Sequence, residues 1–169
     1  SGVYPDEGSS EILIENNVVY RVRTCPLFQH YGKDNIVRNN IFAFGGKGQM
    51  QRCREDKPCH YVAEGNIVYG DIEQMLGGVW KNGDWKVGRN VYWGASGKPK
   101  FTDLDFEAWK THGNDTSSIV ADPMFMDAAN DDFRLHPDSP ALKLGFQPIA
   151  LSETGLYGDE EWVALPQRY

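Results

Sequence analysis

The chain has 169 residues, of which 40% are hydrophobic and 24% are charged, and its formal net charge is −7. This length and composition are those of one folded globular domain with its own core, which excludes a disordered tail. The excess of acids argues against a nucleic-acid partner, because phosphate binding relies on clustered Lys and Arg. No apolar run approaches the roughly 18 residues that a membrane-spanning helix needs.

A short sequence motif recurs four times within residues 1–100. Each copy places an Asn between two short alternating segments, which is typical of strand, turn and strand. The corner asparagines are Asn17, Asn40, Asn66 and Asn90, spaced by 23, 26 and 24 residues. Such a period is too short for a helix pair and matches one turn of a parallel β-helix. We therefore predict an all-β fold, a right-handed parallel β-helix of the pectate-lyase-like solenoid type, its hand following the rule for parallel crossovers.

Side-chain directions follow from this repeat. The corner asparagines are expected to form a buried ladder in which each amide bonds the next, and Asn also tolerates left-handed backbone at such a corner. The aliphatic residues after them are expected to stack inside the solenoid; they are Val18, Ile41, Ile67 and Val91. A second inner wall is expected from the preceding strands; its residues are Ile12, Ile36, Val62 and Val87.

After residue 93 the repeat breaks. The segment 102–113 opens with Thr-x-x-Asp and closes on Gly113, which predicts one short surface helix. Residues 147–169 are expected to form an irregular cap, with a last turn at 159–165, that covers an exposed end of the solenoid. The predicted organisation is β-helix coils over 1–100, the helix and final irregular coils over 101–146, and the cap over 147–169.

Metal and disulfide chemistry has weak support. Cys53 and Cys59 could close a short loop in an oxidising compartment, and the reduced state is the open alternative. A zinc site would use Cys25, Cys53, Cys59 and His60, which lack the tight C-x2-C spacing of structural zinc. A calcium site would use Asp122, Asp127, Asp131 and Asp132, which turn formation explains more simply. We therefore expect no metal and no other cofactor.

The residues that precede each strand–Asn–strand segment are polar and aromatic instead of aliphatic, which is typical of a surface groove. Alignment of YPDEG with FQHYG stacks Tyr4 on Phe28, Pro5 on Gln29, Asp6 on His30 and Glu7 on Tyr31, with Met50, Gln51 and Arg52 as the next row. Coils about 4.8 Å apart bring such neighbours within hydrogen-bonding reach. A carboxylate pair drawn from different coils would have the spacing that glycosidases use.

Roles in this groove can be assigned as hypotheses. Asp6, Glu7 and His30 are the candidate catalytic residues, because carboxylates and imidazole move protons. The candidate substrate-binding residues offer aromatic faces or polar tips; they are Tyr4, Gln29, Tyr31, Gln51, Arg52 and Trp80. The alternative is that Asp6, Glu7, His30 and Arg52 form a surface salt-bridge network.

Four runs of the sequence carry a resemblance to a known family. They are EGSSEILIENNVVYR, FQHYGKDNIVRNNIFAFG, GRNVYW and the ending ADPMFMDAANDDFRLHPDSPALKLGF. These runs resemble the C-terminal half of glycoside hydrolase family 141, β-helix proteins of bacterial polysaccharide degradation. The resemblance implies an acidic catalytic pair on the β-helix face, with Asp6 of YPDEGSS as one member. Family members act on fucose-bearing pectin side chains or xylan and are several times longer.

The expected function is therefore hydrolysis of a plant or algal polysaccharide or oligosaccharide by a secreted or periplasmic protein. Because of its length, the chain is expected to be a fragment that docks on preceding coils or on a second copy. Two alternatives stay open. A polysaccharide lyase would need a cation to neutralise a uronate, for which Arg52 and Arg54 are candidates. A non-catalytic carbohydrate-binding or structural β-helix would keep its function after Asp6→Asn.

Overall fold

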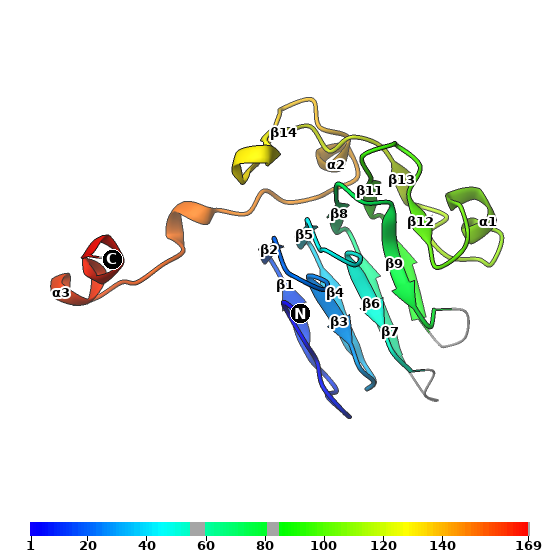
Figure 1. Cartoon of the computed structure of the whole chain (residues 1–169), viewed down its shortest axis with the longest axis horizontal. Coiled ribbons are helices and arrows are strands. Elements are labelled where there is room, and N and C mark those ends of the chain that lie inside the picture. The colour runs from blue at the N-terminus through cyan, green and yellow to red at the C-terminus, as the bar shows by residue number, and fades with distance from the viewer. Residues whose placement is uncertain (55–59, 81–84, 169) are drawn as a thin grey trace.

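Three parallel sheets dominate the computed structural model, which describes residues 1–54, 60–80 and 85–168 (Figure 1). Each turn of the chain contributes one short strand to each sheet, so that the sheets together enclose a parallel β-solenoid of about four turns. The predicted all-β parallel β-helix is confirmed. Within the described ranges, no helix has both the length and the apolar character needed to cross a bilayer.

The strands are short and regularly distributed. Sheet A contains β3 (Leu27–Gln29), β6 (Met50–Arg52), β9 (Gln74–Gly78) and β12 (Lys100–Phe101). Sheet B contains β1 (Leu13–Glu15), β4 (Asn35–Arg38), β7 (Tyr61–Glu64) and β10 (Trp85–Gly88). Sheet C contains β2 (Val18–Tyr20), β5 (Ile41–Ala43), β8 (Ile67–Tyr69), β11 (Val91–Trp93) and β13 (Ile119–Val120).

The remaining elements lie after the fourth coil. An antiparallel pair is formed by β14 (Phe125–Asp127) and β15 (Asp132–Leu135). The α-helices are α1 (Phe106–Lys110), α2 (Pro140–Lys143) and α3 (Glu160–Val163). Short 3-10 helices span Ala128–Asn130, Leu151–Glu153 and Leu165–Arg168.

The corner between sheets B and C holds the predicted asparagine ladder. The Oδ1 of Asn66 accepts hydrogen bonds from the backbone N–H and the Nδ2 of Asn40, both at 3.0 Å. Asn66 in turn donates through its N–H and Nδ2 to Asn90 Oδ1, at 2.8 and 3.1 Å. Its Nδ2 also donates to the buried carbonyl of Val37. Each side-chain amide therefore satisfies buried backbone groups of the neighbouring coil and holds the two coils in register.

The left-handed residue at this corner is the one before each ladder asparagine. Asn16, Asn39, Gly65 and Arg89 have φ values of 57°, 52°, 62° and 54°. The left-handed conformation therefore lies one residue before the ladder asparagine, whereas it was expected at the asparagine itself. A single left-handed residue turns the chain sharply. The next side chain is thereby free to point along the stack.

Two apolar layers stabilise the coils, one inside the solenoid and one outside sheet C. The inner core contains Phe42 and Val68 of sheet C together with apolar residues of sheets A and B. The predicted aliphatic stack faces outward instead, where Ile41 is buried under Phe133 and Phe146. Its predicted inward direction is therefore wrong, because alternating side chains place Phe42 inside and Ile41 outside.

Sheet B corrects the second predicted wall in a similar way. Ile36 is 36% exposed, and Val62 lies in register with it on the outer face. Ile12 is also 36% exposed; it precedes β1, in line with the buried Asn35, at the uncovered edge of the first coil. The inner column contains Ile14, Val37, Ala63 and Val87, so Val87 is the member of the predicted wall that belongs to it. The error arises because Ile12 to Ile14 and Ile36 to Val37 offer apolar residues to both faces of the strand.

The end of the solenoid after the fourth coil is covered by α1. Asp105 is the N-cap of this helix and accepts the Ala108 N–H at 2.8 Å, so the helix is shorter than the predicted 102–113. Trp109 is fully buried; its ring stacks on Phe101 and meets the edge of Trp85. The helix thereby closes the apolar interior at this end.

A buried carboxylate ends the asparagine ladder beneath α1. Asp115 accepts hydrogen bonds from Asn90 Nδ2, Tyr92 Oη, Trp109 Nε1 and Ser118 Oγ. Burial raises the pKa of Asp115, although these donors favour its charged form. Burial, together with the Asp115 carboxylate, also raises the pKa of Tyr92 well above its usual range. The last rung of the ladder is therefore an ionisable group held by side chains from the coil and from the helix.

The chain after α2 runs back across the outer face of sheet C and then leaves the body. Phe146 and Ile149 pack on the aliphatic stack, and Gln147 exchanges two hydrogen bonds with Asn39. From Ala150 onward the chain projects past β2 and away from the coils (Figure 1). Residues 146–149 thus cover the outer face of sheet C, and the cap expected over 147–169 stays a prediction.

Replacement of a central ladder residue is expected to destabilise the chain strongly. Asn66→Ala removes the acceptor of the buried Asn40 N–H and the side-chain donor to the Val37 carbonyl, at about 1–3 kcal/mol for each buried bond lost. We expect the free energy of unfolding to fall by roughly 3 kcal/mol, measured by urea denaturation. Asn17→Ala is the matched control at the first coil and should cost about 1 kcal/mol. Equal losses from the two substitutions would contradict the role of the ladder.

The Asp115 carboxyl is expected to make stability depend on pH. Its folded-state pKa is raised, so the folded chain holds the proton more tightly than the unfolded chain does. The resulting stabilisation is complete below the unfolded pKa of about 3.9 and is lost as pH rises through the folded value. Asp115→Asn removes this dependence. Urea denaturation of both proteins across the acidic range should show the wild type losing its relative stability as pH rises, and a constant difference would contradict this.

Candidate functional site

The outer face of sheet A holds a column of aromatic and amide side chains. The Phe28 N–H donates to the Val3 carbonyl at 2.9 Å, and the His30 N–H donates to the Pro5 carbonyl at 3.1 Å. These bonds set Tyr4 beside Phe28, and strand pairing sets Phe28 beside Gln51. The register predicted by aligning YPDEG with FQHYG is therefore present in the structure.

Tyr4 and Phe28 form the aromatic part of this column. Their rings meet edge to face with centroids 4.8 Å apart, and Tyr4 is 49% exposed. Desolvation raises the pKa of the Tyr4 phenol, and the nearby Asp6 carboxylate raises it further. Tyr4 therefore offers a protonated hydroxyl group and an exposed apolar ring beside a carboxylate.

Asp6 and His30 form a loose acid–base pair next to this column. Asp6 Oδ1 lies 3.7 Å from His30 Nδ1, longer than a hydrogen bond. The His30 ring is held between Tyr4 and Tyr31, at centroid distances of 6.4 and 5.3 Å. Catalytic hydrogen bonds are often long before substrate binds. The pair is thus placed to exchange a proton once a ligand brings the two side chains together.

Glu7 pairs with Arg54, whereas Asp6 lies next to His30. Its Oε1 lies 3.4 Å from Nη1 of Arg54, and the Arg54 guanidinium lies over the Tyr31 ring. Both members of this ion pair are exposed, so it contributes little to stability. The three candidate catalytic residues therefore divide between two pairs, Asp6 with His30 and Glu7 with Arg54.

A hollow of about 540 Å³ opens on the same face, further along the solenoid. It extends over β6, β9 and the residues directly after β12; its lining includes Lys47, Gln51, Gln74, Gly77, Thr102 and Asp103. Gly77 pairs in register with Gln51, and a Cβ at Gly77 would lie 3.3 Å from the Gln51 side chain. The absence of that Cβ makes room for the hollow. Its volume is in the range of small-molecule sites.

Gln29 and Arg52 lie on the other side of the sheet. Each is 1% exposed, because side chains alternate along β3 and β6 and the neighbouring Phe28 and Gln51 point outward. The Arg52 guanidinium lies over the Trp85 ring, and its Nη1 donates to the Val79 carbonyl. Both residues were expected to bind substrate in the groove, and this prediction is wrong because they lie inside the solenoid.

Trp80 is also buried, at 1% exposure. Its ring stacks on Trp85 with centroids 4.4 Å apart, and its Nε1 donates to the Gly77 carbonyl at 2.7 Å. This bond ties the tryptophan to the strand that forms the floor of the hollow. Trp80 therefore supports the hollow and offers no exposed face to a sugar ring.

Metal ligation finds no support in the described ranges, where no three His, Cys, Asp or Glu side chains gather as ligands. Cys53 and Cys25 are free thiols, while Cys59, which the disulfide and zinc hypotheses require, lies outside these ranges. The acidic residues near the C-terminus make local bonds. Asp122 accepts the Met124 N–H, and Arg134 lowers the pKa of Asp132 to about 2. Turn formation and ion pairing therefore explain these acids.

Comparison with known proteins gives a relative without a described activity. The chain is 31% identical over 140 residues to the uncharacterized protein YwoF of Bacillus subtilis. The match covers 79% of this chain and 26% of YwoF, so the chain spans about a quarter of the length of that relative. No family model and no solved structure matches the chain.

Substitution of Asp6 is expected to change the titration of Tyr4. Asp6→Asn removes the negative charge that disfavours the tyrosinate, so the pKa of Tyr4 should fall while desolvation keeps it above the usual value. Nuclear magnetic resonance titration with tyrosine labelled at Cζ measures this. Glu7→Gln is the matched control and should give a smaller decrease. An unchanged Tyr4 pKa in Asp6→Asn would contradict the placement of these side chains.

Proposed function

We propose that the outer face of sheet A binds a polysaccharide, and that the protein to which this chain belongs hydrolyses a glycosidic bond in it. The observation that supports this is the arrangement on one rigid sheet of the Tyr4–Phe28 column, the Asp6–His30 pair and the hollow. The face extends over four coil spacings, roughly 19 Å at about 4.8 Å each. An elongated ligand lying along the solenoid axis would contact all three parts.

The side chains on this face suit a sugar chain. Exposed aromatic rings pack against the apolar faces of sugar rings, while Gln51, Gln74 and Lys47 offer hydrogen-bond partners for hydroxyl groups. The inner residues keep this surface rigid, because Arg52 and Trp80 both pack on Trp85 beneath it. A rigid platform binds without the entropic cost of ordering its own loops.

In the proposed reaction, Asp6 acts as a general acid or base and His30 positions it. Glycoside hydrolysis needs a second carboxylate about 5–9.5 Å away, depending on the stereochemical outcome. Glu7 faces Arg54, so a carboxylate from another coil is the stronger choice. This function agrees with the resemblance to glycoside hydrolase family 141 and implies a secreted or periplasmic protein acting on plant or algal polysaccharide.

The alternative of a polysaccharide lyase receives less support. A lyase needs an accessible cation beside the uronate carboxylate, and Arg52, one of the two candidates, is buried inside the solenoid. Arg54 is exposed but pairs with Glu7.

The test combines binding with product analysis. Xylan and pectin-derived oligosaccharides are titrated into the chain by isothermal calorimetry, and released reducing ends are measured in parallel. Gly77→Val should weaken binding at least about tenfold, equivalent to about 1.4 kcal/mol, because its side chain enters the hollow and displaces the Gln51 side chain. Asp6→Asn should retain binding and abolish release of reducing ends.

Controls separate this proposal from its alternatives. Val62→Thr changes the outer face of sheet B and should leave binding unchanged. An ultraviolet-absorbing unsaturated product would identify a lyase. Unchanged activity in Asp6→Asn would remove that residue from catalysis, and absence of binding by the unsubstituted chain to every oligosaccharide would contradict the proposal.

A further inference from the structure

The two ends of the solenoid differ in whether another element covers them. α1 covers the end after the fourth coil, whereas β1 and β2 are the terminal strands of sheets B and C at the other end. Asn40 Oδ1 accepts two hydrogen bonds from Asn17, through its N–H and its Nδ2, both at 3.0 Å. Among the described residues, none donates in this way to Asn17 Oδ1. The first coil therefore presents the acceptor that a corner asparagine of another coil would use.

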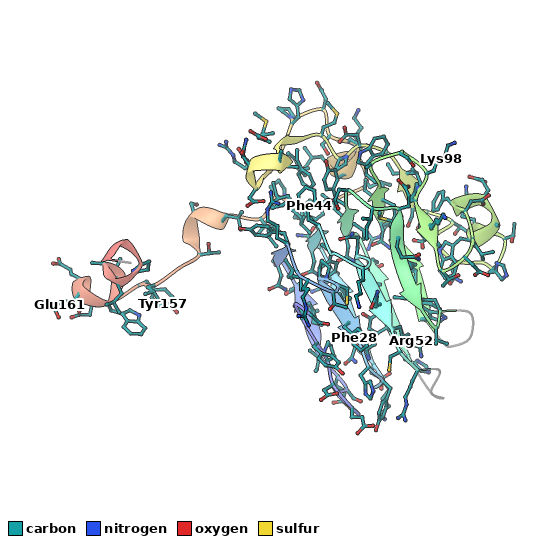
Figure 2. All side chains as sticks on the ribbon, viewed as in Figure 1. Phe28, Phe44, Arg52, Lys98, Tyr157 and Glu161 are labelled. Carbon is teal, nitrogen blue, oxygen red and sulfur yellow. The ribbon has the colours of Figure 1, made fainter. Side chains whose placement is uncertain are left out.

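Residues 150–166, which we call the C-terminal arm, carry apolar side chains without a covering layer. Exposed large side chains of the arm are Leu151, Leu156, Tyr157, Trp162 and Val163. Tyr157 is 86% exposed, and Figure 2 shows it on the arm, well away from the coils. A cluster of this kind is typical of a surface that binds another apolar surface.

The C-terminal arm continues an interface that already exists. The segment before it covers the outward aliphatic stack of sheet C, from Val91 back to Val18. At the first coil this interface encloses an apolar cavity of about 160 Å³, lined by Val18, Ile41, Ile149 and Leu151 among others. The arm then runs on past β2 in the same direction (Figure 1). A coil stacked on β1 and β2 would place its own aliphatic residue beneath the arm.

We propose that this open edge and the C-terminal arm together form a docking surface for one further β-helix coil, joined to the chain on the N-terminal side of β1. The coil would carry an asparagine that donates to Asn17 Oδ1 and, directly after it, an aliphatic residue that the arm covers. A second copy of the chain does not meet this requirement, because its own Phe133 and Phe146 already cover its aliphatic stack. The proposal is independent of the ligand bound on sheet A.

The test adds a coil made from the chain itself. A copy of residues 24–47 placed directly before Ser1 would set its Asn40 and Ile41 one coil ahead of Asn17 and Val18. Amide hydrogen exchange at the start of the arm, residues 151–154, should slow at least about tenfold relative to the 169-residue chain, because one coil extends the solenoid by about 4.8 Å. A second extension, a copy of residues 1–24 in the same place, should give the same result in case the first does not fold.

Matched substitutions within the added coil separate its two contacts. Ile41→Asn in the copy keeps the ladder bond and removes the aliphatic side chain, so the added coil should stay protected while the arm loses its protection. Asn40→Ala in the copy should weaken protection of the added coil itself.

Three results would overturn the proposal. The first is an arm that exchanges freely although the added coil is protected. The second is failure of both extensions to stack, shown by unprotected amides in the added residues. The third is protection of the arm in the 169-residue chain that rises with protein concentration alongside dimer formation in sedimentation, which would identify a second copy as the occupant.

Discussion

The buried amide ladder is the interaction on which the rest of the solenoid depends. Asn40, Asn66 and Asn90 each accept two hydrogen bonds from the asparagine of the coil before, so a slip of one residue at the corner would leave buried donors without partners. Because the ladder lies at the corner between sheets B and C, it fixes the register of these two sheets directly. Parallel pairing within sheet A then aligns Tyr4, Phe28 and Gln51 on its outer face.

The fold could be predicted because the ladder asparagines recur in the sequence at the spacing of one coil. The direction of the aliphatic stack could not, since Ile41 and Phe42 are both apolar and both buried, and alternation disappears when both faces of a strand are covered. The layer that buries Ile41 comes from residues 133–149, about a hundred positions later in the chain. The sequence around Ile41 therefore does not indicate that its side chain is covered.

The candidate site was predictable to a similar extent. Repeated glycines in YPDEG and FQHYG aligned Asp6 with His30 correctly, because that part of the wall repeats. The hollow has no such signal: it depends on Gly77, which lies one coil beyond Gln51, and on loop residues that belong to no repeat. Gln29 and Arg52 were misplaced because polar residues are expected outside, whereas this solenoid keeps both of them inside.

The covered face of sheet C has a consequence for synthesis of the chain. Ile41 and Ile67 reach their buried state after Phe133 and Phe146 have left the ribosome, since those residues form the layer over them. Contacts of such large sequence separation slow folding and leave apolar strands exposed in the interval. During that interval the nascent coils carry a continuous aliphatic ridge, so their solubility depends on whatever shields the ridge until translation passes residue 146.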